Sequence, residues 1–300
     1  MRTQVYCQER ARRLVVPTFF VVVLGLFCFG LYSAKPIDAG SGVVEVTFDH
    51  GMVDWSNGVI RAVGLGVPPD NAMNATHAHE MAKRAGRVVA YRNLLEIVEG
   101  IHVDSHTLVK NYMVESDTIN TKVKGIVHGA RVTQEKALPD GSYQVTVEMK
   151  LAGDFQKTVL PPREREPDPL KFQKISAPKN NSSSPEVLVY TGLVVDAQGL
   201  NVKQTMSPKL LMEDGRVAYG AEWVDPEVAQ HQTVVGYVSG IPNATSHERV
   251  IAAPLVVKAL RVDAANPSDL VISDADAQTL HLVPEHVAFL KKAKVLVVLQ

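Results

Sequence analysis

An almost unbroken apolar run, Leu14–Leu31, follows Arg10, Arg12 and Arg13 near the start of the chain. A basic segment followed by an apolar one is the pattern of a secretory signal. A run of this length is also just long enough to cross a bilayer as a helix. We therefore predict that residues 1–34 are a signal peptide or an N-terminal membrane anchor, and that the remainder is exported to the periplasm or the outer-membrane periphery. The sequence leaves open whether this segment is cleaved, lipidated or retained.

The exported portion is mildly acidic and has no thiol. The whole chain has 31 Lys and Arg against 32 Asp and Glu, and the first segment holds more bases than acids, so the rest carries net negative charge. This balance argues against nucleic acid as a partner. Both cysteines, Cys7 and Cys28, lie in the first segment. The exported portion can therefore form no disulfide, cysteine nucleophile or thiolate metal site.

A stretch rich in proline and serine, residues 159–185, divides the exported portion. Proline lacks a backbone donor and disfavours helical conformation in the residue before it. The composition is that of an exposed linker. We therefore predict a first domain at residues 41–158 and a second at 186–300.

In the first domain, the pattern predicts a helix between strands. Alternation of apolar residues predicts a strand over Trp55–Gly66. Asn74 is a suitable N-cap for a helix that runs to about Val98, with Gly100 in the stop position. The apolar stripe of this helix begins with small residues, so we expect the helix to lie close against a sheet.

Two further strands are predicted after the helix. Ile119–Glu135 reads as one long strand with a bulge or bend at Gly125 and Gly129. Tyr143–Leu151 alternates, with odd-numbered residues inward. The order strand, helix, strand, strand predicts an α+β sandwich in which one helix covers an antiparallel sheet.

The second domain is predicted to be α+β and richer in strands. Apolar runs predict strands within 187–195, 254–262 and 295–299, and Glu213-Asp214-Gly215 predicts a hairpin between 209–212 and 216–219. Ser273 begins a capping box for a short helix, and residues 285–292 are expected to form a second one.

The sequence contains only incomplete versions of catalytic motifs. His79 and Glu80 begin a zinc-protease motif, but Lys83 occupies the place of the second histidine. The dinucleotide fingerprint, the nucleophile elbow and the phosphate loop are not completed. We therefore predict that the protein is not an enzyme and that it has no catalytic residue, no cofactor and no metal site.

One histidine group was considered as a metal site. Glu99, His102 and His106 would share a face only if the helix continued past Gly100, and the residues that follow argue that it ends there. The alternative that we prefer is that these histidines lie on the surface.

Lys83, Arg84 and Arg87 form a basic stripe opposite the apolar stripe of the predicted helix. Such a stripe is commonly a solvated face. The alternative is a contact with anionic lipid headgroups or with an acidic surface of a neighbouring subunit. We therefore name these three residues as a candidate self-assembly or membrane-contact face.

Five segments in the same order resemble one bacterial family. They are GVIRAVGLGVPP (58–69), AYRNLLEIVEGIHVDSHT (90–107), MVESDTI (113–119), VKGIVHGARV (123–132) and PDGSYQVTVEMKL (139–151). Residues 45–155 thus resemble the envelope lipoprotein family called LPP-twenty. That family includes the flagellar outer-membrane protein FlgP, and its domain is similar to the N-terminal part of the flagellar ring protein FlgT.

The resemblance implies an envelope location, a compact domain, and assembly into rings or discs near the outer membrane, with no enzymatic activity. Lipoproteins of this family attach through a cysteine preceded by small residues. In this chain Phe27 precedes Cys28, so we do not expect lipidation of Cys28.

Three functions are considered. The first is a non-enzymatic structural or assembly protein of the cell envelope, such as part of a flagellar outer-membrane ring or disc, which forms a homo-oligomer or binds ring proteins. The second is a periplasmic binding module for glycan, peptidoglycan or lipid. The third is a hydrolase, which a pocket that holds His and carboxylate together would support.

Overall fold

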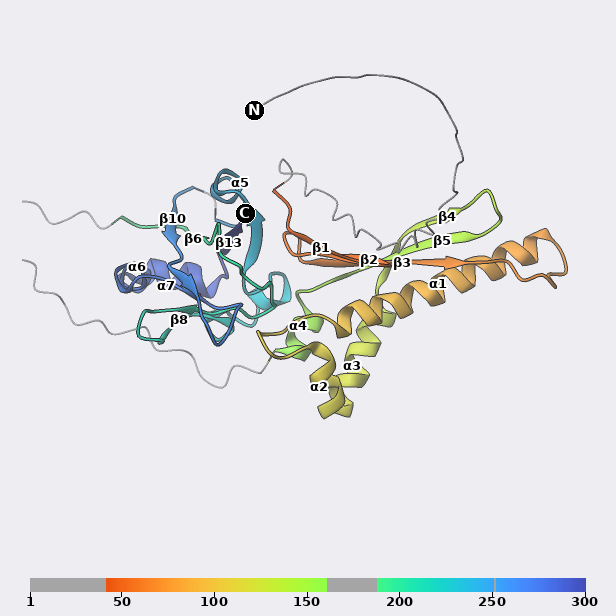
Figure 1. Ribbon diagram of the computed structural model, residues 1–300, viewed down its shortest axis with the longest axis horizontal. Coiled ribbons are helices and arrows are strands. Elements are labelled where there is room, and N and C mark those ends of the chain that lie inside the picture. The colour runs from red at the N-terminus through yellow and green to blue at the C-terminus, as the bar shows by residue number, and fades with distance from the viewer. Residues whose placement is uncertain (1–41, 161–187, 251) are drawn as a thin grey trace, which may run out of the picture. The chain divides into compact units, whose positions relative to one another are not determined.

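The computed structural model describes residues 42–160, 188–250 and 252–300 (Figure 1). The described residues all belong to one compact unit, which spans Ala39–Gln300. The predicted export segment and nearly all of the predicted linker lie outside the described residues, so both stay predictions. The division of the exported portion into two separately folding domains likewise stays a prediction.

Across the described ranges, no helix combines the length and the hydropathy that a membrane span requires.

The first sheet is antiparallel and has the order β1-β2-β3-β5-β4. Its strands are β1 (Glu45–Phe48), β2 (Gly51–Asp54), β3 (Val59–Gly66), β4 (Arg131–Ala137) and β5 (Tyr143–Lys150). The alternating burial of β5 confirms the predicted inward set. The predicted strand over Trp55–Gly66 begins too early, because the Asp54 carboxylate accepts hydrogen bonds from the backbone (2.9 Å) and side-chain (2.8 Å) N–H groups of Asn57 and closes a turn there.

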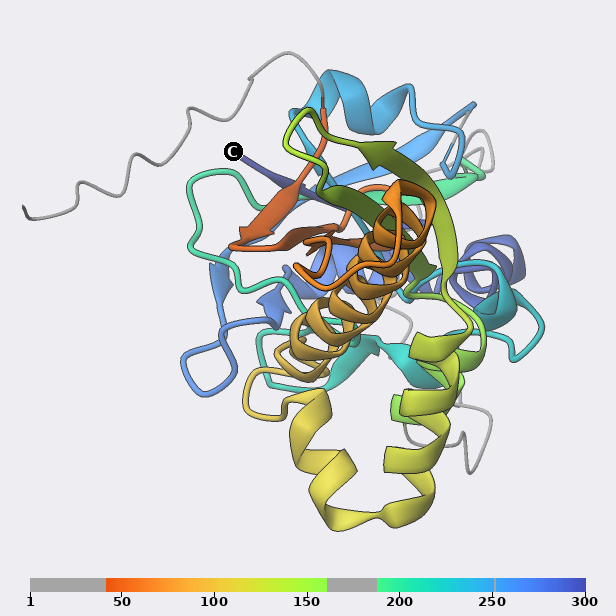
Figure 2. The same ribbon diagram turned by 90° about the vertical axis from the view of Figure 1, so that its right-hand side faces the viewer.

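Helix α1 (Ala75–Glu99) lies along one face of this sheet (Figures 1 and 2). As predicted, Asn74 is its N-cap, since Asn74 Oδ1 accepts from the backbone N–H of His77 at 2.8 Å, and Gly100 is its C-cap. The close approach to the sheet is also confirmed. A Cβ on Gly66 of β3 would lie 1.9 Å from the Ala82 carbonyl oxygen of α1, so only glycine fits at this position.

The long strand predicted over Ile119–Glu135 is wrong. Residues Asp117–His128 form helix α3, which ends at Gly129 and is followed by β4. Ser116 caps the helix, and Val123 and Val127, four residues apart, are buried on one face of it. The first part also contains α2 (Val109–Glu115) and α4 (Asp154–Val159).

The second part contains two four-stranded sheets. The parallel sheet has the order β10-β6-β13-β9, and the mixed sheet has the order β11-β12-β7-β8. The parallel strands are β6 (Gly192–Asp196), β9 (Gly236–Ser239), β10 (Pro254–Lys258) and β13 (Val295–Leu299). The strands of the mixed sheet are β7 (Leu210–Leu211), β8 (Val217–Tyr219), β11 (Arg261–Val262) and β12 (Leu270–Val271).

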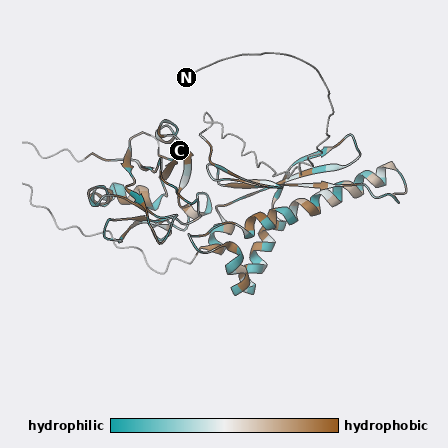
Figure 3. Cartoon of the chain, viewed as in Figure 1, coloured by the Kyte–Doolittle hydropathy of each residue, from teal (hydrophilic) through white to brown (hydrophobic). Residues whose placement is uncertain are grey.

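Helices cover the parallel sheet on both faces. Along β13, Leu296 and Val298 share a cluster with Ala244 of α5 (Ile241–Thr245), whereas Val295 and Val297 share the main core with α7 (Pro284–Lys291). A strand buried on both faces reads as an unbroken apolar run, and the hydrophobic colouring of β13 is visible in Figure 3.

Most predicted elements of the second part are confirmed. These are the hairpin of β7 and β8, β13, α7, and α6 (Asp274–Leu280) with its Ser273 N-cap. The elements that were not predicted are α5, η1 (Ala221–Trp223), η2 (Val228–Gln230) and the strands β9 and β12. The fold class is α+β, as the sequence predicts.

Candidate assembly surface

The first sheet ends in two edge strands, β1 and β4. All four residues of β1 are exposed. The backbone N–H of Trp55 donates to the Val44 carbonyl at 2.9 Å. Because the two sides of a strand alternate in an antiparallel ladder, the backbone groups of Glu45 and Thr47 face away from β2. They are therefore available to another strand.

Strand β4 forms the opposite edge, and its register with β5 shifts between Val132 and Gln134. Arg131, Thr133 and Lys136 are exposed along it. A bulge and charged side chains are common features of edge strands, because they restrict which strands can pair there.

The two edges carry opposite charge. Glu45 lies on β1 and Asp49 directly follows it, and both are exposed. Arg131 and Lys136 lie on β4, also exposed. The remaining charged residue of β4, Glu135, is engaged within its own chain, as described next. The β1 edge is thus acidic and the β4 edge basic.

The structure places the predicted basic face of α1 beside β4. Lys83 Nζ lies 2.8 Å from Glu135 Oε2, and Arg87 Nη2 lies 2.6 Å from Glu135 Oε1. The hydrogen bond to Glu135 raises the pKa of Lys83, and the same bond lowers the pKa of Glu135. Lys83 and Arg87 of the predicted face therefore form ion pairs within the same chain. Arg84 is exposed and has no ion pair within the described ranges.

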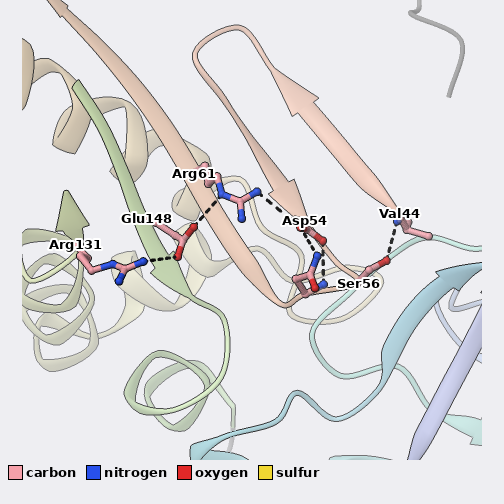
Figure 4. Close-up of polar contacts among 7 residues, drawn as sticks. Val44, Asp54, Ser56, Arg61, Arg131 and Glu148 are labelled. Carbon is pink, nitrogen blue, oxygen red and sulfur yellow. Dashed lines mark hydrogen bonds and ion pairs between the residues drawn. The ribbon is translucent and has the colours of Figure 1, made fainter. Parts of the chain in front are cut away.

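A charge ladder crosses the sheet face that lies opposite α1 (Figure 4). Arg61 Nε donates to Glu148 Oε2 at 2.9 Å, Arg61 Nη1 lies 3.8 Å from Asp54 Oδ2, and Arg131 Nη2 lies 3.7 Å from Glu148 Oε1. The ladder joins side chains from β2, β3, β5 and β4.

An apolar groove of about 500 Å³ lies beyond the tip of the β1–β2 hairpin, where β2 no longer pairs with β3. Phe48, Leu65 and Val89 line it. Asn93 of α1 lies at its floor, and its side-chain N–H donates to the Val63 carbonyl at 2.7 Å. The helix thus satisfies a backbone group that β2 leaves unpaired.

The residues considered as a metal site do not form one. Helix α1 ends at Glu99, and the Asp104 carboxylate accepts from the backbone N–H groups of His106 and Thr107 in the following turn, each at 2.9 Å. His106 Nε2 donates to the Ala265 carbonyl at 2.8 Å. Within the parts of the chain that the structure describes, no group of three His, Cys, Asp or Glu side chains could hold a metal ion.

Sequence reasoning missed the β1 edge. The signal was present in Glu45–Phe48, where polar and apolar residues alternate, followed by Asp49-His50-Gly51 as a turn. Because the strand has only four residues, the alternation was too short to be recognised. The pairing of Glu135 with α1 had no local signal, because 48 residues separate Arg87 from Glu135.

The fold and the surface together define an α+β protein whose first sheet has no further strand at either edge in the described part of the chain. Residues 192–300 match the family described as the second domain of Tp0624 from Treponema pallidum. This match covers about a third of the chain, and it contains both sheets of the second part. No curated protein matches the chain.

Proposed function

We propose that this protein is a non-enzymatic structural or assembly protein of the bacterial cell envelope, and that copies join through the edges of the first sheet. The observation that carries the proposal is the opposite charge of the two free edges, acidic at β1 and basic at β4. Exposed edges accept strands from other chains, and complementary charge selects which edge meets which.

In this arrangement β4 of one copy pairs with β1 of the next. Each copy then uses two different surfaces, so the contact is heterologous and generates a closed ring or an open filament. The resemblance of residues 45–155 to the LPP-twenty family supports a ring or disc near the outer membrane. The arginine-flanked apolar run supports export and attachment to a membrane.

Cross-linking between single-cysteine variants tests the geometry. Thr47→Cys places a thiol on the β1 edge and Thr133→Cys places one on the β4 edge, both in a chain whose Cys7 and Cys28 are replaced by serine. A mixture of the two full-length variants, treated with a short bis-maleimide, is expected to form covalent dimers. Each variant alone is expected to form no covalent dimer, because its thiols lie on only one of the two paired edges.

A matched control uses Lys157→Cys in place of Thr133→Cys, because Lys157 is exposed on α4 and belongs to neither edge strand. If this pair cross-links as well as the edge pair, or if each edge variant alone forms covalent dimers, the edge-to-edge arrangement is wrong.

A further inference from the structure

A polar cavity of about 360 Å³ lies between the turn that precedes β3 and the loops that flank β9 and α5. Its lining is rich in hydrogen-bond donors and in basic groups, and Glu248 is the one carboxylate in it. The assembly surface shares no residue with this lining. The lining residues used below are Lys150, His231, His247, Glu248 and Arg249.

Arg249 is a partly buried cation that has no carboxylate partner among the described residues. Its Nε donates to the Ala293 carbonyl at 2.6 Å, just beyond α7, its Nη1 donates to Thr233 Oγ1 at 3.3 Å, and its Nη2 donates to the Thr233 carbonyl. All three acceptors are neutral. Among the residues that the structure places, none forms an ion pair with Arg249, although charges removed from water are ordinarily paired.

The guanidinium keeps both its charge and spare donors. Burial lowers the pKa of Arg249 to about 10, so the group is still protonated at neutral pH. A guanidinium has five N–H groups, and only three of them have an acceptor within the described ranges. Gly236 leaves room for it, because a Cβ there would lie 3.0 Å from Arg249 Nη1.

His247 supplies a further donor. Its Nδ1 accepts from the backbone N–H of Arg249 at 3.1 Å, so the neutral ring carries its proton on Nε2. Burial, together with the charge of Arg249, lowers the pKa of His247 and favours this neutral form. Lys150, at the end of β5, adds an exposed ammonium to the same lining.

We propose that this cavity binds a small oxyanion, a phosphate or carboxylate group, with Arg249 as its anchor and Lys150 and His247 as additional donors. An oxyanion accepts several N–H bonds at once and matches the fork of a guanidinium. It also provides a negative charge, which no described residue supplies to Arg249. A cavity of this size accommodates a small molecule.

Calorimetric titration of the full-length protein in detergent tests the site. Inorganic phosphate and acetate are titrated separately, at an ionic strength held constant with sodium chloride. At least one of them is expected to bind saturably, with one site per chain, and the stronger one identifies the anion class. Lys150→Glu is expected to raise the Kd at least tenfold. His247→Asn retains an acceptor for the Arg249 backbone N–H and is expected to raise the Kd less.

Lys157→Glu is the matched control, since it makes the same charge change at an exposed position outside the cavity. Circular dichroism of each variant checks that its fold is intact. Absence of saturable binding for both anions would overturn the proposal, and so would equal weakening by Lys157→Glu and Lys150→Glu. Because neither outcome depends on assembly, this test is separate from that of the proposed function.

Discussion

The side-chain hydroxyls of Ser105 and Ser268, which are 163 residues apart in the chain, lie 2.7 Å from each other inside the protein. The backbone N–H of Ser268 also donates to Ser105 Oγ at 2.9 Å, and Ser268 Oγ donates to Asp269 Oδ1 at 3.1 Å. This network joins the loop after α1 to the loop before β12. The first and second parts therefore share buried polar contacts as well as a hydrophobic core.

Ser105→Ala is expected to destabilise the protein by about 1–3 kcal/mol, because it leaves the buried backbone N–H of Ser268 without an acceptor. Urea denaturation of both proteins measures the change. Thr118→Ala, at an exposed position on α3, is the control and should change the free energy of unfolding by less than about 0.5 kcal/mol. A loss no larger than that of the control would show that water replaces the network.

Asp269 is expected to make the free energy of unfolding depend on pH. Burial raises the pKa of this carboxyl, so the folded state retains a proton at pH values where the unfolded chain has lost it. The free energy of unfolding should therefore fall as pH rises from the ordinary aspartate pKa through the raised value. Relative to Asp269→Asn, which cannot titrate, the wild type should lose stability over that interval. A difference between the two proteins that is constant with pH would contradict this.

Gly66→Ala is expected to lower the free energy of unfolding by about 1–3 kcal/mol or more. The alanine methyl group would meet the backbone of α1 and force the helix away from the sheet. Gly125→Ala is the matched control. No atom lies within 4 Å of a Cβ at Gly125, which is exposed in α3, so alanine there should stabilise by up to about 1 kcal/mol. Thermal unfolding of both variants should shift Tm in opposite directions.

Charge exchange tests the proposed edge pairing. Lys136→Glu alone should weaken self-association by about tenfold, which corresponds to about 1.4 kcal/mol, and adding Glu45→Lys should restore it. Sedimentation velocity measures both. Lys122 is exposed on α3, and Lys122→Glu serves as the control.

Arg84→Glu tests the predicted basic face of α1 without breaking the ion pairs of Glu135. An effect on self-association as large as that of Lys136→Glu would place the contact on α1 instead.

Export is tested with a reporter fused after Gln300, which should be active only if it functions in the periplasm, because of the apolar run at Leu14–Leu31. Reporter activity confined to the cytoplasm would refute export.

Cys28→Ser should leave membrane partition unchanged, since Phe27 is too bulky for the usual lipoprotein processing site. Loss of membrane partition in the serine variant would show that Cys28 is lipidated.

Local signals predicted the elements whose stabilising interactions are local. Asn74 and Ser273 cap their helices by accepting from backbone N–H groups three residues away. The alternation of Tyr143–Lys150 and the unbroken apolar run of β13 each depend only on which faces are buried. Residues 117–128 were misread because two glycines resembled a strand bulge, whereas Gly125 faces solvent on α3 and Gly129 ends it.

The sequence by itself determined the α+β class, the caps, the turns and the small residues that let α1 approach the sheet, because these follow from neighbours within a few positions. Only the tertiary structure decided which charges meet. Glu135 binds Lys83 and Arg87 of α1, and Arg249 donates to Ala293, 44 residues away, instead of to a carboxylate. Charge interactions act through space over a few ångströms, and spacing along the chain does not reveal which distant groups the fold brings within that range.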